Sequence, residues 1–279
     1  MKERISITLD SKILEGIDKS IDGIAIRNRS HAIEKALSTS LSMNTSKHAI
    51  LLAGGRKISI SGRKVSKCMA VIDGMPIMHH MINGLVENGV RNITVVLGGG
   101  FGDVEDYFGN GIDMGAKIDY AYEQRDLGTL GAVYNAFKQN RKNEPFFVLN
   151  ADQVFRMDME RMYAQHVQTG AAATIALLSS GSSIKRTGAT KMEGIRILEF
   201  VEKSREPGLI STGCYLFSPK IIDYFRSSMS SIEKDLFPKL LEESALYGFI
   251  YPGPWYSLDN DNIERSVRII SEMLKGMNP

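Results

Sequence analysis

The chain has 279 residues, of which 43% are hydrophobic and 24% are charged, with a formal net charge of +2. These proportions are typical of globular proteins and exclude a chain that is disordered throughout. There is no apolar run of about 18 residues, and the start lacks the apolar core of a signal peptide, so we expect a cytoplasmic protein without a membrane partner. The 2 cysteines are too few for a disulfide framework.

The chain is divided by a short polar segment, residues 42–47, which separates two units with different hydrophobic patterns. Before this segment come one alternating run and two short helical patterns. After it, apolar runs alternate with helical patterns, as they do in βαβ units. We therefore predict a small domain at residues 1–43 and a larger α/β domain at residues 48–279.

Residues 4–9 of the first unit alternate strictly between polar and apolar side chains, which predicts a strand with one apolar face. Helical patterns follow Asp10 and begin at Ser30, two residue types that commonly cap helix N-termini. One strand and two short helices cannot enclose an adequate core, and a lone strand leaves its edge unpaired. Both problems are solved if two chains pair their strands, so we predict a homodimer, with a tetramer through the larger domains as an alternative.

This first unit resembles the ribbon-helix-helix family of DNA-binding dimers in its Arg-Ile-Ser-Ile-Thr-Leu-Asp strand and in the Asn28-Arg29-Ser30 start of its second helix. The resemblance implies that a two-stranded ribbon enters the major groove and that the second helix offers N–H groups to a phosphate. The DNA-binding residues that it implies are Arg4, Ser6, Thr8, Arg29, Ser30 and His31. The alternative is a dimerisation ribbon without a DNA role, because residues 1–41 are only weakly basic.

The second unit opens with an apolar strand pattern at residues 49–53, followed by Gly54-Gly55, a turn that lets backbone amides approach a phosphate. A second apolar run, residues 146–150, delivers Asp152 at its C-terminal end. In open α/β sheets, ligands collect at that edge. Further patterns predict helices at 76–85 and 103–108 and a buried strand at 93–97. We expect a Rossmann-like, mixed but mostly parallel sheet.

From residue 48 to about residue 275, the sequence resembles the sugar-phosphate nucleotidyltransferases, or nucleotide-sugar pyrophosphorylases. The motifs that carry the resemblance are Leu52-Ala-Gly-Gly55, Lys67 ahead of Asp73-Gly-Met-Pro76, Asp106-Tyr-Phe-Gly109, Leu127-Gly-Thr129, Asn150-Ala-Asp152, Phe200-Val-Glu-Lys203, Thr212-Gly-Cys-Tyr-Leu-Phe217, Ser231-Ile-Glu-Lys-Asp-Leu-Phe-Pro238 and Trp255. The resemblance implies the reaction of NTP with sugar-1-phosphate to give NDP-sugar and pyrophosphate. Positioning and charge neutralisation do most of the catalysis in such a displacement at phosphorus.

The same resemblance implies roles for individual residues. Lys67 would steady the phosphates as a point charge, and Asp152 would hold Mg²⁺ against the α-phosphate. Glu202 and Lys203 would meet the sugar phosphate, although they also fit a solvated surface pair. The nucleotide-binding residues that it implies are Ala53, Gly54, Gly55, Glu123, Gly128 and Thr129.

One departure from the family pattern removes a cation from the phosphate site. Active members follow Gly-Gly with x-Gly-Thr-Arg, whereas this chain has Ser59 at the position of the arginine. Loss of such a cation typically costs about 10²-fold or more in rate. The candidates to replace its charge are Arg56, Lys57 and Arg63.

A second departure removes a metal ligand. The family pattern Trp-x-Asp is here Trp255-Tyr-Ser257, so a hydroxyl stands where the second carboxylate would bind the metal. The candidates to replace that ligand are Asp259 and Asp261. Both departures fall on the parts that act on the reacting phosphates, whereas the glycines and hydrophobic residues that shape the fold are retained.

These departures favour a dimeric transcriptional regulator whose larger domain binds a nucleotide or sugar nucleotide, with Mg²⁺ if a nucleotide is bound, and whose catalysis is weakened or lost. The alternative is an active sugar-1-phosphate nucleotidyltransferase that carries a DNA-binding, dimerising domain. A third reading is a structural dimer whose pocket binds nothing. The retained Lys67 and Asp152 favour an occupied pocket, whereas Ser59 and Ser257 disfavour turnover.

Overall fold

The computed structural model of the chain describes residues 5–21, 23, 26–40, 48–55, 58–60, 63–98, 102–123, 125, 127–140, 143–180, 187–204, 208–226, 228–258 and 262–277. The chain forms two compact units, Met1–Asn44 and Thr45–Pro279, each described here by itself. Their boundary lies within the polar segment of the sequence. In the described ranges, no helix combines the length and the apolar character that crossing a membrane requires.

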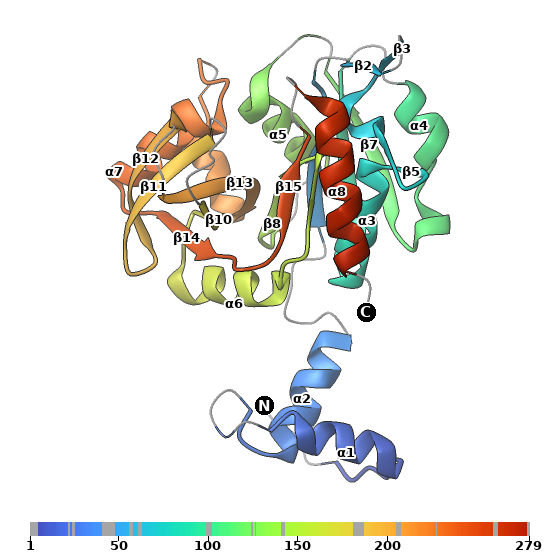
Figure 1. Cartoon of the computed structure of the whole chain (residues 1–279). Helices are drawn as coiled ribbons and strands as arrows, with labels where there is room; N and C mark the ends of the chain where they lie inside the picture. Colours follow the sequence, from blue (N-terminus) through green and yellow to red (C-terminus); the bar gives the residue numbers. More distant parts are fainter. Residues whose placement is uncertain are drawn as a thin grey trace. The chain divides into compact units, whose positions relative to one another are not determined.

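The described part of the first unit contains two helices, α1 at Ser11–Lys19 and α2 at Arg29–Ser40 (Figure 1). Asp10 caps α1, as its position in the sequence predicts, because its carboxylate accepts a hydrogen bond from the backbone N–H of Lys12 at 2.8 Å. Arg29 at the start of α2 forms an ion pair with Asp18 of α1, with 2.6 Å between Nε and Oδ1. This pair fastens the two helices to each other.

The strand predicted at residues 4–9 is not formed in this single chain. Residues 5–10 have no regular secondary structure, and Arg4 lies outside the described residues. The physical reason is that a β-strand exists only by hydrogen bonding to a neighbouring strand, which the alternation of side chains cannot supply. Ile5 and Ile7 are consequently 71% and 51% exposed, and α1 buries none of its residues.

The second unit is built, within the described residues, on one nine-stranded sheet. Its strands are β1 His48–Leu52, β6 Asn92–Leu97, β7 Lys117–Tyr122, β8 Phe146–Asn150, β10 Ala173–Ser180, β11 Thr187–Glu193, β12 Arg196–Ser204, β13 Gly208–Phe217 and β14 Leu246–Ile250. They lie in the order β10-β14-β12-β11-β13-β8-β1-β6-β7. The mixed sheet is as predicted, and β6 coincides with the buried strand expected at 93–97.

The sheet is wholly parallel in the half that contains β1 and mixed in the other half, where β10 also pairs in parallel with β14, which corrects the expectation of a mostly parallel sheet. Strand β1 pairs in parallel with β6 and β8, and β6 pairs in parallel with β7. In the other half, β13 is antiparallel to β8, β10 and β11, and β11 is antiparallel to β12. The antiparallel pairing of β11 with β12 follows from their short connection, in which Glu193 pairs with Arg196, because a tight turn can join antiparallel strands only.

Short strands and turns complete the second unit. The short strands are β2 Ile58–Ile60, β3 Arg63–Val65, β4 Val71–Ile72, β5 Met75–Pro76, β9 Gln153–Phe155 and β15 Trp255–Ser257. The 3₁₀ turns are η1 Lys67–Met69, η2 Ile112–Met114 and η3 Pro219–Tyr224, and a π-helix, η4, spans Ile232–Leu236. Strands β2 and β3 form a hairpin, and β9 pairs with β15.

Helices cover both faces of this sheet (Figure 1). Their bounds are α3 Ile77–Glu87, α4 Gly102–Phe108, α5 Gly128–Gln139, α6 Met159–Thr169, α7 Phe237–Glu242 and α8 Ile263–Met277. One core cluster contains apolar side chains of α3, α4 and α6, and the other contains those of α5 and α7. Helix α3 carries apolar residues at positions 77, 78, 81, 82 and 85, and all five are buried because this spacing keeps them on one face.

Candidate active site

The glycine turn and the acidic strand end predicted from the sequence lie side by side. Strands β1 and β8 are parallel neighbours, with Leu52 paired to Asn150, so Gly54 and Asp152 follow at the same edge of the sheet. The backbone N–H of Ala151 donates to the carbonyl oxygen of Leu52 at 3.1 Å and extends the contact past both strands. This edge is the C-terminal one, where open α/β sheets bind ligands.

Lys67 and Asp152 form an ion pair at this edge, with 2.5 Å between Nζ and Oδ2. Their side chains are only 20% and 23% exposed, so the pair is partly withdrawn from water. Lys67 begins the short turn η1, and the preceding Ser66 donates its hydroxyl to the Asp103 carboxylate at 2.9 Å. The pair brings together the cation and the carboxylate to which the resemblance assigned catalysis, although the sequence separates them by 85 positions (152 minus 67).

A cavity of about 200 Å³ opens around this ion pair. Its lining residues come from both halves of the sheet, from the β9–β15 pair and from η1 and η4. They are Lys67, Asn150, Asp152, Gln153, Gly188, Phe200, Glu202, Ser211, Thr212, Gly213, Tyr215, Glu233, Trp255, Ser257 and Leu258. Glu202, the residue expected to meet the sugar phosphate, is among them. The side chain of Lys203 lies outside the described part of β12.

Trp255 fixes the wall that contains Ser257. Its Nε1–H donates to Gln153 Oε1 at 2.7 Å and to the carbonyl oxygen of Thr212 at 3.1 Å. Ser257 pairs with Gln153 in the β9–β15 register, and Leu258 N–H donates to the carbonyl oxygen of Asp152 at 2.9 Å. The hydroxyl that replaces the second family carboxylate therefore lies in the same cavity as Asp152.

Glu233 is a lining residue to which the sequence assigned no role. It stands on η4, and Tyr215 donates its hydroxyl to Glu233 Oε1 at 2.8 Å. Burial raises the pKa of Tyr215 well above its ordinary value, and the negative charge of Glu233 raises it further. The sequence does contain a motif around this residue, Ser231–Pro238. The motif does not indicate that the segment is a π-helix or which way Glu233 faces.

The residues expected at the nucleotide fall into two groups. Gly54 lies against Glu123: a Cβ at Gly54 would come within 2.9 Å of Glu123 Oε2 and within 3.3 Å of the backbone nitrogen of Gly98, so glycine lets both groups approach closely. Ala53 is buried beside this turn, and Gly55 faces open space. Thus Gly54 and Glu123 meet at the edge of the sheet, and their role in nucleotide binding stays a prediction.

The second group, Gly128 and Thr129, contacts the chain before η4. Gly128 has a φ of +69°, and a Cβ there would come within 2.3 Å of the carbonyl oxygen of Ser230. Thr129 accepts a hydrogen bond from the backbone N–H of Ile232 at 3.0 Å through its hydroxyl. Both residues thus hold the segment that leads to Glu233.

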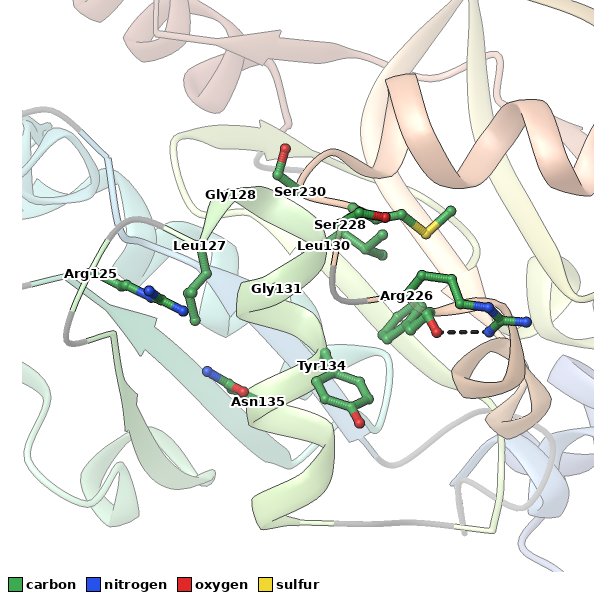
Figure 2. A pocket seen from close by; sticks show the side chains of 12 residues that line it. Arg125, Leu127, Gly128, Leu130, Gly131, Tyr134, Asn135, Arg226, Ser228 and Ser230 are labelled. Carbon is green, nitrogen blue, oxygen red and sulfur yellow. Dashed lines mark hydrogen bonds between the residues drawn. The ribbon is translucent and has the colours of Figure 1, made fainter.

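A larger cavity of about 800 Å³ lies along α5 and has Gly128, the first residue of that helix, in its lining (Figure 2). Figure 2 shows Arg125 and Arg226 on different walls, with Tyr134 and Asn135 projecting from the helix between them. None of its described lining residues is acidic, and Lys67 and Asp152 do not reach it. Its size therefore does not make it the reaction site: the ion pair and the carboxylates are in the smaller cavity.

Several predicted replacements for the missing family residues cannot be placed. Arg56, Lys57, Asp259 and Asp261 lie outside the described residues. Ser59 and Arg63 belong to the β2–β3 hairpin, in which Ile60 pairs with Arg63, but their side chains are outside the described part. The source of a compensating cation thus stays a prediction.

For a metal ion, the described residues contain no group of three or more His, Cys, Asp or Glu side chains. Mg²⁺ does not need such a group, because it is often bound through one or two carboxylates together with substrate phosphates and water. Asp152, which lines the same cavity as Lys67 and is 23% exposed, fits the single-carboxylate form of such a site.

The residues predicted to bind DNA differ in their exposure and in the contacts that their side chains make. Ser6 and Thr8 are exposed, and Ser30 and His31 lie in the first turn of α2. Arg29 is different from the expectation: its Nε and Nη2 donate to Asp18 at 2.6 and 2.7 Å, so the guanidinium is engaged within the unit. The hydrogen bond from Arg29 also lowers the pKa of Asp18.

Comparison with known proteins agrees with the geometry. Residues 48–258 match the family model described as "Nucleotidyl transferase". The chain is 31% identical over 206 residues to D-glycero-alpha-D-manno-heptose 1-phosphate guanylyltransferase of Aneurinibacillus thermoaerophilus, covering 72% of this chain and 88% of that protein. It is 27% identical over 240 residues to mannose-1-phosphate guanylyltransferase of Mycobacterium tuberculosis, covering 83% of this chain and 66% of that protein.

A solved structure shows the same fold. The crystal structure of HddC from Yersinia pseudotuberculosis complexed with GMP-PN matches with a TM-score of 0.68 at 24% sequence identity, covering 81% of this chain and 99% of that chain. These comparisons lie on the second unit, because the family match begins at residue 48.

Proposed function

Because the chain belongs to the nucleotidyl transferase family, with a sugar-phosphate nucleotidyltransferase domain homologous to guanylyltransferases, we propose that it transfers a nucleotidyl group to a sugar 1-phosphate. The observation that carries the proposal is the Lys67–Asp152 ion pair at the strand edge, inside a cavity that also contains Glu202. The departures at Ser59 and Ser257 favoured a regulator with weakened catalysis. Homology to guanylyltransferases favours the active enzyme instead.

In the proposed reaction, a phosphate oxygen of the sugar 1-phosphate forms a bond to the α-phosphorus of NTP, and the bond from that phosphorus to the bridging oxygen breaks. The products are NDP-sugar and pyrophosphate. The attacking oxygen is already anionic, so no general base is required, and the protein mainly neutralises and positions charge. Lys67 can contact the triphosphate, which frees Asp152 to hold Mg²⁺ together with phosphate oxygens. Bound Mg²⁺ supplies further charge neutralisation.

Guanine is the base that we propose for the nucleotide. Glu123 meets Gly54 at the strand edge, and its carboxylate is an acceptor, whereas guanine presents N1–H and an amino group as donors. Uracil and thymine offer one N3–H donor between two carbonyl acceptors, and adenine and cytosine offer an amino donor beside an acceptor nitrogen, so only guanine presents two adjacent donors to a carboxylate. The names of the relatives, which are guanylyltransferases, support the same choice.

The test is pyrophosphate release with Mg²⁺, in which GTP, ATP, UTP and dTTP are each combined with mannose 1-phosphate or a heptose 1-phosphate. We expect release with GTP that falls by about 100-fold or more in Lys67→Ala and in Asp152→Asn. The matched controls are Lys275→Ala and Asp73→Asn, which disrupt an ion pair of 3.9 Å outside the cavity. Nucleotide binding without any product formation would return the assignment to a nucleotide-binding regulator.

For the first unit, we propose pairing with a second copy of the chain through residues 4–9, as the ribbon-helix-helix resemblance implies. The supporting observation is the exposure of Ile5, Ile7 and Ile13, at 71%, 51% and 55%, in a unit that is too small to bury them. A paired ribbon would cover the apolar face and present Ser6 and Thr8 on the other face.

DNA binding by that ribbon is a further proposal, and Arg4 is its most direct test. With DNA from upstream of the chain's own coding region, we expect Arg4→Ala to weaken specific binding by about 1–3 kcal/mol, the contribution of a base-edge contact. Binding to random DNA, measured in parallel by fluorescence anisotropy, should change less. Equal losses on both DNAs would assign Arg4 to phosphate contact, and absence of wild-type binding would remove the DNA role.

A further inference from the structure

Glu233 is held in one orientation in the candidate active site. Its Oε1 accepts from the Tyr215 hydroxyl at 2.8 Å, and its Oε2 accepts from the Ser231 hydroxyl at 3.0 Å. Tyr215 is 2% exposed, so its hydroxyl cannot move away without losing a buried hydrogen bond. A carboxylate has about four lone-pair sites, so each oxygen keeps one for a ligand in the cavity.

The segment that carries Glu233 is fixed from several directions. The backbone N–H groups of Ser230 and Ser231 both donate to Asp235 Oδ2 at 2.8 Å. Ser231 also accepts from the N–H of Lys234 at 3.2 Å and thereby caps η4. Since π-helical turns occur frequently at functional sites, and this one carries a cavity-lining carboxylate, η4 has the character of a ligand-binding element.

The cavity that Glu233 lines is acidic. Of its described lining residues, three are acidic (Asp152, Glu202 and Glu233) and one, Lys67, is basic. Lys67 is paired with Asp152, so the positive charge of Lys67 lies at the proposed phosphate site. Both Glu233 and Glu202 raise the pKa of Tyr215 through their charges, which places the two glutamates near the same hydroxyl.

We propose that Glu233, held by Tyr215 and Ser231, is a specificity-determining residue that accepts hydrogen bonds from hydroxyl groups of a neutral sugar 1-phosphate. The same carboxylate excludes sugar 1-phosphates that carry a second anionic group, such as uronic acid 1-phosphates. This inference rests on the proposed nucleotidyl transfer. A neutral sugar satisfies the fixed acceptors of Glu233 with its O–H donors, whereas a uronate would place a carboxylate beside the fixed carboxylate of Glu233, in a cavity that Glu202 also lines.

The experiment compares mannose 1-phosphate with mannuronic acid 1-phosphate, using GTP and Mg²⁺ and measuring kcat/KM by pyrophosphate release. We expect the wild type to prefer the neutral sugar by about 100-fold, and Glu233→Gln to reduce that preference to about tenfold or less, because the amide keeps the shape but removes the charge. Glu264→Gln, an exposed change on α8, is the matched control and should leave the preference unchanged.

Ser231→Ala separates the position of Glu233 from its charge. This variant keeps the carboxylate but loses one of its two supports, so we expect a higher KM for mannose 1-phosphate with the exclusion of the uronate retained. Thermal unfolding of each variant shows whether the fold is intact. A purely structural Glu233 would change stability without changing the ratio between the two substrates.

The outcomes distinguish the two proposals. Turnover of mannose 1-phosphate with the same preference in wild type and Glu233→Gln overturns this inference and leaves nucleotidyl transfer standing. Efficient use of the uronic acid 1-phosphate by the wild type also overturns it. If no sugar phosphate reacts with any NTP, or binds in a calorimetric titration, the proposed function and this inference both fail.

Discussion

His166 is a buried side chain whose charge state should affect folding. It is 1% exposed on α6, with Nδ1 2.8 Å from Thr174 Oγ1 and Nε2 2.9 Å from Ser218 Oγ. Burial, together with the nearby positive charge of Lys220, lowers its pKa from 6.5 to about 4. The ring is therefore neutral in the folded protein at neutral pH and bridges three segments of chain.

We predict an acid-dependent loss of stability from this residue. Between about pH 4 and pH 6.5 the unfolded chain binds a proton at His166 that the folded chain does not, so stability is complete above pH 6.5 and falls with decreasing pH. The shift corresponds to at most about 3 kcal/mol. Guanidinium unfolding of wild type and His166→Gln at pH 7.5 and pH 4.5 measures it. Equal pH dependence in both proteins would contradict the prediction.

Sequence motifs indicated Lys67 and Asp152 but not Glu233, although all three line the same cavity. Lys67 and Asp152 stand in motifs that keep a fixed relation to a strand or a short turn, so the fold brings them together. Glu233 could not be recognised in this way, because a π-helix adds one residue per turn and changes the direction of its side chains. Charge and spacing alone do not reveal that irregularity.

At the scale of elements, the predicted bounds were most accurate where a single hydrophobic periodicity extends over the whole element. Helix α3, predicted at 76–85, spans Ile77–Glu87, and α4, predicted at 103–108, spans Gly102–Phe108. The direction of strands was less predictable, because buried runs such as those in β13 are apolar whether their neighbours are parallel or antiparallel. Chain connections, and the β11–β12 turn above all, decide that direction.

The contact between the start of α5 and the segment before η4 supplies a prediction at this scale. Gly128→Ala would place a Cβ 2.3 Å from the carbonyl oxygen of Ser230, at a φ of +69° that is unfavourable for alanine. We expect unfolding free energy to fall by about 2 kcal/mol. Because Ser230 must move, Glu233 should be displaced, and KM for the sugar phosphate should rise.

Gly84→Ala is the control for that measurement. Gly84 lies in α3, and a Cβ there would have no neighbour nearer than the carbonyl oxygen of Phe155 at 4.0 Å. Alanine is favoured over glycine inside a helix by about 1 kcal/mol, so this change should leave stability equal or higher and activity unchanged. A Gly128→Ala protein with wild-type stability and KM would show that the Ser230 segment adapts freely.

At the scale of the whole molecule, the two units differ in whether they can bury their own apolar side chains. Among the residues that the structure describes, the three core clusters contain residues of the second unit alone, from Ala49 onward. In the described part of the first unit, Ala32 is the buried hydrophobic residue. The sequence predicted this imbalance from length alone, because about 40 residues rarely enclose a core without a second chain.

Deletion of residues 1–44 tests what each unit contributes. Because the second unit holds all three core clusters, the truncated protein should remain folded, with an unchanged thermal midpoint and unchanged pyrophosphate release. Because the proposed ribbon is removed, self-association measured by analytical ultracentrifugation should be lost. Ile7→Lys in the full chain is the matched point change, since it charges the apolar face without removing the helices.

The two variants together decide where copies of the chain meet. If both are monomeric at micromolar concentration, the apolar side chains of residues 5–9 are the contact, and the exposed Ile5 and Ile7 of the single chain are explained. A truncated protein that remains dimeric would place the main contact on the larger domain. Lost activity in a folded, monomeric truncation would mean that the catalytic unit needs pairing, since its own core and cavity residues are all retained.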